Sequence, residues 1–269
     1  MNHPQIAAFA RLARENSEPT RKLEGQNTLL GRTVHDMAYD PIHDEIVTGS
    51  PFAQAILTFR GGANGEEPPL RVIQGPRTRI MSSGNGIDKI AIDAAHGEIF
   101  APSRNRQILI FDREANGDAP PKRILGGPNA PFGGNPTIRV DPVNNLLFVT
   151  GNRGDMLIYD RTASGDARPR AVIKNGPTGN QFVVHNGWLI IHSYDSVYAW
   201  SIHDTGDNVQ PRWKIPASLG PRSHEYTAQR GIDVDPKNKE VIVASASGNQ
   251  IRIFSMPELF GDPPSRNRN

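Results

Sequence analysis

The sequence predicts an all-β protein, a β-propeller of four-stranded antiparallel blades, and two observations carry this prediction. An aliphatic residue stands three places before an aromatic six times, with successive aromatics 50, 52, 48, 41 and 54 residues apart. Each interval also holds short apolar stretches of strand length, separated by turn residues. Strands of this length cannot bury their own apolar faces, so the repeats must stack against one another. The six aromatics are Phe9, Phe59, Phe111, Tyr159, Trp200 and Phe254.

The two inner strands of each unit are predicted from an apolar stretch on either side of a turn. Asp-Pro occurs in three of these turns, at Asp40, Asp141 and Asp235. An Asp side chain accepts hydrogen bonds from the backbone of such a turn, and proline presets φ for the next residue. The predicted pairs are 37–40 with 45–49, 89–93 with 98–103, 138–141 with 146–150, 182–185 with 188–191, and 232–235 with 240–244.

The third strand of each unit contains the aromatic, and a polar loop follows it. Glycine stands six residues after the aromatic in four of these loops, where it supplies positive φ without a Cβ clash. The fourth strand begins with proline and carries a cation. We expect this outermost strand to use proline and arginine against edge-to-edge association. The glycines are Gly65, Gly117, Gly165 and Gly206, and the arginines expected on the outer rim are Arg71, Arg123, Arg170 and Arg212.

The ends of the chain leave the number of blades open. Residues 6–25 match the third and fourth strands of a unit, but no inner pair precedes them, so six third-strand segments accompany five inner pairs. We favour a six-bladed propeller with one incomplete blade over a five-bladed one closed by the N-terminal strand. Residues 1–269 are expected to form a single domain. Its repeat units span approximately 1–26 (partial), 34–75, 86–127, 135–175, 180–218 and 230–269.

Composition excludes several function classes. The net charge of +2 is too small to indicate a nucleic acid partner. The absence of cysteine excludes disulfides, thiolate metal sites and a cysteine nucleophile. No apolar run approaches the ~18 residues of a membrane span, and no signal peptide pattern opens the sequence.

The unit ILIFDREANGDAPPKRILGGP, residues 108–128, resembles the bacterial NHL-type or YVTN-type β-propeller repeat. The resemblance extends over nearly the whole chain. It implies the propeller fold, a bacterial origin and an extracytoplasmic location, periplasmic or extracellular. Related propellers include lactonases, lyases and binding modules, so the resemblance alone leaves the activity open.

A propeller binds ligands mainly on the face where the inner strands begin and where the loops between second and third strands meet. The sequence places polar residues at both kinds of position, and a loop of residues 217–230 interrupts the repeat close to them. We expect a non-enzymatic scaffold that binds a protein, a small molecule or a carbohydrate on this face. The predicted ligand-binding residues are His35, Asp36, Asp88, Asn135, Asn180, Arg230, His192, Tyr194 and His224.

The main alternative is a metal-dependent hydrolase that resembles the sugar lactonases. In that case Asp36, Asp88, Asn135 and Asn180 would hold a divalent cation on the propeller axis. No inner-strand glutamate occupies a matching position, so we expect neither a cofactor nor catalytic residues. A serine hydrolase built on His192 and Ser193 lacks the sharp turn that exposes a nucleophile.

Overall fold

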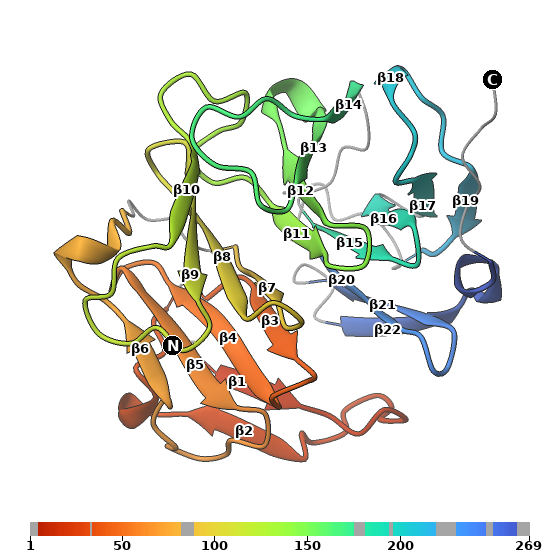
Figure 1. Cartoon of the computed structure of the whole chain (residues 1–269). Helices are drawn as coiled ribbons and strands as arrows, with labels where there is room; N and C mark the ends of the chain where they lie inside the picture. Colours follow the sequence, from red (N-terminus) through yellow and green to blue (C-terminus); the bar gives the residue numbers. More distant parts are fainter. Residues whose placement is uncertain are drawn as a thin grey trace. The chain divides into compact units, whose positions relative to one another are not determined.

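The computed structural model describes residues 5–32, 34–81, 89–174, 181–193, 196–218, 230–245 and 250–262, with only the backbone of Arg153, Arg230 and Ser245. The chain is all-β, and these residues form five blades of the β-propeller type (Figure 1). The five-bladed alternative is confirmed, and the preferred count of six is wrong. The wrong count came from residues 5–24, whose two strands form a two-stranded sheet and not a four-stranded blade. Closure by the N-terminal strand stays a prediction.

The first two blades each contain four antiparallel strands in sequence order. Before them, β1 (Gln5–Ala8) pairs with β2 (Arg21–Glu24). Blade 1 contains β3 (Met37–Asp40), β4 (Glu45–Ser50), β5 (Ala55–Arg60) and β6 (Arg71–Ile73). Blade 2 contains β7 (Ala91–Asp93), β8 (Glu98–Ser103), β9 (Gln107–Asp112) and β10 (Arg123–Gly126). Short 3-10 turns, η1 (Gln26–Thr28) and η2 (Pro76–Thr78), follow β2 and β6.

The remaining blades follow the same plan. Blade 3 contains β11 (Ile138–Asp141), β12 (Leu146–Thr150), β13 (Met156–Asp160) and β14 (Ala171–Lys174), with η3 (Asn152–Gly154) before β13. Blade 4 contains β15 (Phe182–His185), β16 (Trp188–Ser193), β17 (Ser196–Ser201) and β19 (Trp213–Pro216). Blade 5 contains β20 (Arg230–Asp235), β21 (Glu240–Ser245) and β22 (Gln250–Ser255), followed by η4 (Pro257–Phe260). No helix among the described residues is long and apolar enough to cross a membrane.

The chain divides into two compact units. The first contains residues 1–138 and the loop 162–167, and the second contains residues 139–161 and 168–269. The first unit therefore holds β1, β2 and blades 1 and 2, and the second holds most of blade 3 with blades 4 and 5. The prediction of one domain over residues 1–269 stays a prediction.

The turn between the two inner strands is built on an aspartate, as predicted. In blade 1 the Asp40 Oδ1 atom accepts hydrogen bonds from the backbone N–H groups of Ile42 and His43, at 2.8 and 3.0 Å. Asp93, Asp141 and Asp235 accept the equivalent bond from the residue three places later. These aspartates are structural because their carboxylates are occupied by the turn itself.

The repeated aromatics fill the layer between neighbouring blades. Phe111 is 0% exposed and belongs to a core cluster that joins blade 1 residues such as Val47 to blade 2 residues such as Ile99. Trp200 belongs to the equivalent cluster between blades 3 and 4. Phe59 and Tyr159 are also buried, whereas Phe254 is only partly buried. The blade alignment inferred from the sequence is therefore confirmed.

The loop glycines also join each blade to the one before it. Gly117 has φ +66°, its N–H donates to the Val72 carbonyl at 2.7 Å, and its own carbonyl accepts from the Gln74 N–H at 3.0 Å. This places a short parallel bridge on the outer strand of blade 1. We call this arrangement a blade latch. The same pairing joins Leu23 to Gly65, Leu125 to Gly165, and β14 to the short strand β18 (Gly206–Asp207). Each latch supplies hydrogen-bond partners to a strand edge that would otherwise be open.

All four arginines expected on the outer rim form ion pairs. The Arg71 side chain is largely buried, and its Nη2 lies 2.5 Å from Oε2 of the buried Glu45, which also pairs with Arg113 of blade 2 at 2.8 Å. Arg123 pairs with the buried Glu98, and Arg212 with the buried Asp204. Arg170 is the exposed one and pairs with the exposed Asp160. Three of the four arginines therefore neutralise buried carboxylates within the fold.

The turns of blades 1 and 3 use different residues for the same contact with the aspartate, and this difference can be tested by substitution. His43 Nδ1 lies 2.8 Å from Asp40 Oδ2, and Asn144 makes the same contact with Asp141 at 2.8 Å. We expect His43→Asn to change the free energy of unfolding by no more than ~0.5 kcal/mol. His43→Ala should cost about 1 kcal/mol because the buried carboxylate loses a hydrogen bond. Urea unfolding at pH 7 measures both, and an equal cost for the two variants would contradict this account.

The same turn has a defined pH dependence. Burial raises the pKa of Asp40, but the hydrogen bonds from His43 and Ile42 outweigh it, so the pKa lies below its usual value. The contribution of Asp40 to stability is therefore present above the pKa of an unfolded aspartate, ~3.9, and is lost as the pH falls through the lowered folded value.

Candidate binding site

Some of the predicted ligand residues lie at the starts of inner strands. There they form hydrogen bonds within the protein. The Asp36 carboxylate accepts hydrogen bonds from the N–H groups of Met37, at 3.1 Å, and of Ile90, at 3.3 Å. Its carbonyl accepts from Thr48 Oγ1 at 2.8 Å. Asp36 therefore joins the starts of the inner strands of blades 1 and 2. His35, directly before it, is half-buried.

Asn135 and His192 occupy their predicted positions in different units. The Asn135 Oδ1 atom is buried and has no hydrogen-bond partner among the described residues. His192 lies in β16, is buried, and has its Nε2 2.8 Å from the Ala217 carbonyl oxygen. That nitrogen is occupied by the backbone. A ligand-binding role for either residue stays a prediction.

Four of the predicted ligand residues lie outside the described residues, namely Asp88, Asn180, Tyr194 and His224. Arg230 is described only as a backbone position at the start of β20. Their proposed roles stay predictions. Within the described ranges no group of three or more His, Asp or Glu side chains is placed to hold a metal ion.

A groove lies in the first unit, on loops that belong to blades 1 and 2. It consists of two adjoining hollows of about 450 and 310 Å³ that share Gln54, Pro76 and Ile80. One wall is the loop between β4 and β5, the floor is the segment 74–81 that follows β6, and the other wall is the loop between β8 and β9 with the start of β9. These are the two kinds of loop on which the sequence predicted a site. Its lining residues are Phe52, Ala53, Gln54, Gln74, Gly75, Pro76, Arg79, Ile80, Met81, Asn105 and Gln107.

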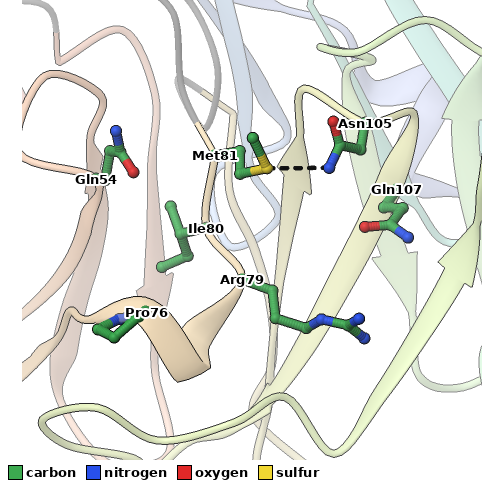
Figure 2. A pocket seen from close by; sticks show the side chains of 7 residues that line it. All are labelled: Gln54, Pro76, Arg79, Ile80, Met81, Asn105 and Gln107. Carbon is green, nitrogen blue, oxygen red and sulfur yellow. Dashed lines mark hydrogen bonds between the residues drawn. The ribbon is translucent and has the colours of Figure 1, made fainter.

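Hydrogen bonds fix the walls of the groove to its floor. On one side, Gln74 Nε2 donates to the Ala53 carbonyl at 2.8 Å. On the other side, the backbone N–H of Arg104 donates to the Met81 carbonyl at 3.1 Å, and Asn105 Nδ2 lies 3.0 Å from Met81 Sδ. Figure 2 shows Gln54 on one side of the groove and Asn105 and Gln107 on the other, with Ile80 and Met81 between them. The groove is therefore largely preformed.

Two residues reach the groove through left-handed backbone conformations. Gln54 has φ +51° and Arg79 has φ +60°. Arg79 directly follows η2, whose end is closed by the Arg79 N–H bonded to the Pro76 carbonyl. Non-glycine residues adopt this region infrequently, so the surrounding loop contacts must hold them there.

The groove lining is rich in carboxamides, and Arg79 is the charged residue in it. Four carboxamide side chains line it, and Phe52 beside them is 66% exposed. The segments 51–54, 74–81 and 104–107 contain four arginines and no aspartate or glutamate. Arg106 is engaged with the carbonyls of Phe132 and Ala130. The arrangement can offer several donors and acceptors beside a small apolar surface, but it presents no general acid or base.

None of the residues that line the groove is among the ligand-binding residues predicted from the sequence, so Gln54, Gln74, Arg79, Asn105 and Gln107 were all missed. These residues line the groove because loops of neighbouring blades meet there and because Gln54 and Arg79 have positive φ. The sequence pattern indicates neither the meeting of the loops nor the positive φ. In comparisons with models of known protein families and with curated proteins, nothing matches the chain.

Proposed function

We propose that this protein is a non-enzymatic β-propeller that binds carbohydrate in the groove of the first unit. The observation that carries the proposal is the lining itself, where Gln54, Gln74, Asn105 and Gln107 surround an apolar floor without any carboxylate. Each carboxamide offers two donors and two acceptor lone pairs. Sugar hydroxyls need both kinds of partner.

The apolar part of the groove fits the same class of ligand. Phe52 is exposed beside Pro76 and Ile80, so a C–H face of a pyranose ring can pack there while its hydroxyls reach the carboxamides.

The resemblance to NHL-type and YVTN-type repeats supports a binding role on a propeller scaffold. We further propose an extracytoplasmic bacterial setting. The chain has no cysteine, which is compatible with that setting but is also compatible with a reducing one. The lactonase alternative has no specific observation in its favour, because both Asp36 carboxylate oxygens accept backbone hydrogen bonds.

A glycan array probed with the full chain tests the proposal. We expect binding to a defined set of oligosaccharides, and we expect Gln54→Gly with Asn105→Ala to weaken it about tenfold or more, since each lost hydrogen bond contributes about 0.5–1.5 kcal/mol. Glycine at position 54 keeps the positive φ and removes only the side chain.

Gln210→Ala is the matched control because it removes an exposed carboxamide that does not line the groove. It should leave binding unchanged. Equal loss in the control and the double variant, or the absence of any glycan bound by the wild type, would contradict the proposal.

A further inference from the structure

The turns η1 and η2, which follow β2 and β6, are built by the same hydrogen bonds. In each turn a buried threonine, Thr28 or Thr78, donates through Oγ1 to the glycine carbonyl three residues earlier at 2.6 Å. The same Oγ1 accepts the backbone N–H two residues later, at 3.3 Å in η1 and 3.2 Å in η2. The residue after the threonine is left-handed in both turns, Leu29 with φ +58° and Arg79 with φ +60°. Arg79 therefore occupies in η2 the position that Leu29 occupies in η1.

This equivalence shows that the turn does not need a cation at position 79. Leu29 is uncharged, and its turn has the same hydrogen bonds and the same left-handed residue. The Arg79 side chain is exposed, and its guanidinium forms no hydrogen bond or ion pair with the part of the chain that the structure describes. In contrast, outer-strand arginines such as Arg123 pair with buried carboxylates. The guanidinium of Arg79 therefore has no structural role in the described fold.

The backbone of Arg79 is fixed, and the groove around it contains no acidic side chain. The Arg79 carbonyl accepts a hydrogen bond from Ser103 Oγ at 3.4 Å, and the same Oγ accepts the Met81 N–H at 3.2 Å. The floor of the groove is thus attached to the end of β8 on both sides of Ile80. Neither hollow is lined by an aspartate or a glutamate. In Figure 2 the Arg79 side chain extends from the floor on the side of Gln107, which lines the same hollow.

We propose that the groove binds acidic oligosaccharides and that Arg79 pairs with the carboxylate of a uronic acid. This inference rests on the carbohydrate-binding function proposed above and adds the charge of the ligand to it. One edge of a guanidinium forms two parallel hydrogen bonds with the two oxygens of a carboxylate. A sulfate or phosphate ester presents three terminal oxygens, and Arg79 is the one charged residue in the described lining. The carboxamides of the groove then bind the hydroxyls of the same sugar.

Isothermal titration calorimetry of the full chain with matched acidic and neutral sugars tests the proposal. The probes are tetrasaccharides of galacturonate and of glucuronate, the methyl esters of both, and a sulfated galactose tetrasaccharide. A methyl ester keeps the sugar ring and removes the charge. We expect the wild type to bind at least one uronate tetrasaccharide about tenfold or more tightly than its ester, because the ester loses a charge-assisted bidentate pair. This preference should shrink as the ionic strength rises.

Two leucine variants decide whether Arg79 is responsible. Arg79→Leu places in η2 the residue that η1 carries at the same position, so its Tm should stay close to that of the wild type. It should bind the acid and the ester with similar affinities. Arg77→Leu is the matched control, because it removes the same charge from an exposed side chain that does not line the groove. It should keep the preference for the acid.

The outcomes separate this inference from the function on which it rests. Equal binding of acid and ester by the wild type would overturn the role of Arg79 and leave a neutral carbohydrate site standing. A preference that persists in Arg79→Leu, or that Arg77→Leu loses to the same extent, would also overturn that role. Tighter binding of the sulfated tetrasaccharide than of either uronate would overturn the assignment of a carboxylate. If the wild type binds none of the five probes, the acidic ligand is wrong, and the glycan array then decides the proposed function separately.

Discussion

Phe111→Ala should lower the free energy of unfolding by about 3–5 kcal/mol. Phe111 is fully buried in the cluster that joins blades 1 and 2, so its removal leaves a cavity in the layer between two blades. The surrounding strands are held by ladder hydrogen bonds and by a blade latch, and they cannot close such a cavity completely. Urea unfolding followed by tryptophan fluorescence measures the change.

Phe9 provides the matched control for this substitution. It occupies the same place in the repeat pattern but is 45% exposed. Phe9→Ala should therefore cost far less, at most about 1 kcal/mol. Similar costs for the two variants would mean that the layer between blades 1 and 2 contributes no more than the N-terminal segment does.

Glu45→Ala should cost about 3 kcal/mol, since its removal leaves two guanidinium groups without their buried carboxylate. Glu45 accepts from Arg71 of its own blade and from Arg113 of blade 2, and it therefore connects the two blades. Glu114 also pairs with Arg71 and Arg113, so it offsets part of the stability that Glu45→Ala removes. The measurement is again the free energy of unfolding at pH 7.

Glu67→Ala is the control, because its ion pair with Arg60 is exposed and should contribute little to the free energy of unfolding.

The pH dependence of the Glu45 contribution gives a second check. Burial raises the pKa of Glu45, but Arg71 and Arg113 outweigh it and lower the pKa below its usual value. The contribution of Glu45 is thus present above the pKa of an unfolded glutamate, ~4.3, and is lost as the pH falls through the folded value. A cost that persists unchanged at acidic pH would contradict the ion-pair account.

Local features of the fold were predictable because their causes are local. The aspartate of each inner turn and the glycine six residues after each aromatic act within a few residues of themselves, and both are confirmed. The buried aromatics were predictable because equivalent positions of stacked repeats fill the same layer. Phe254 is the exception, since it lies in the last blade, whose described part has only three strands.

Long-range partners were not predictable from the repeat. The sequence indicates an arginine in each outer strand, but it does not indicate that Glu45 and Glu98 lie beneath Arg71 and Arg123. The blade latches depend on backbone groups of two different repeats, which carry no side-chain signal. The groove likewise depends on Gln54 and Arg79 in left-handed conformations. Its face was predictable from propeller topology, and its residues were not.

Hydrogen exchange of the full chain, with and without a saturating oligosaccharide from the array, tests the central claim most directly. If the groove binds the sugar, amides in segments 51–54, 74–81 and 104–107 should gain protection together, since these three loops line it. Segments 196–218 and 230–245 of the second unit should exchange as before. Protection confined to the second unit, with the three groove segments unchanged, would contradict the proposed site.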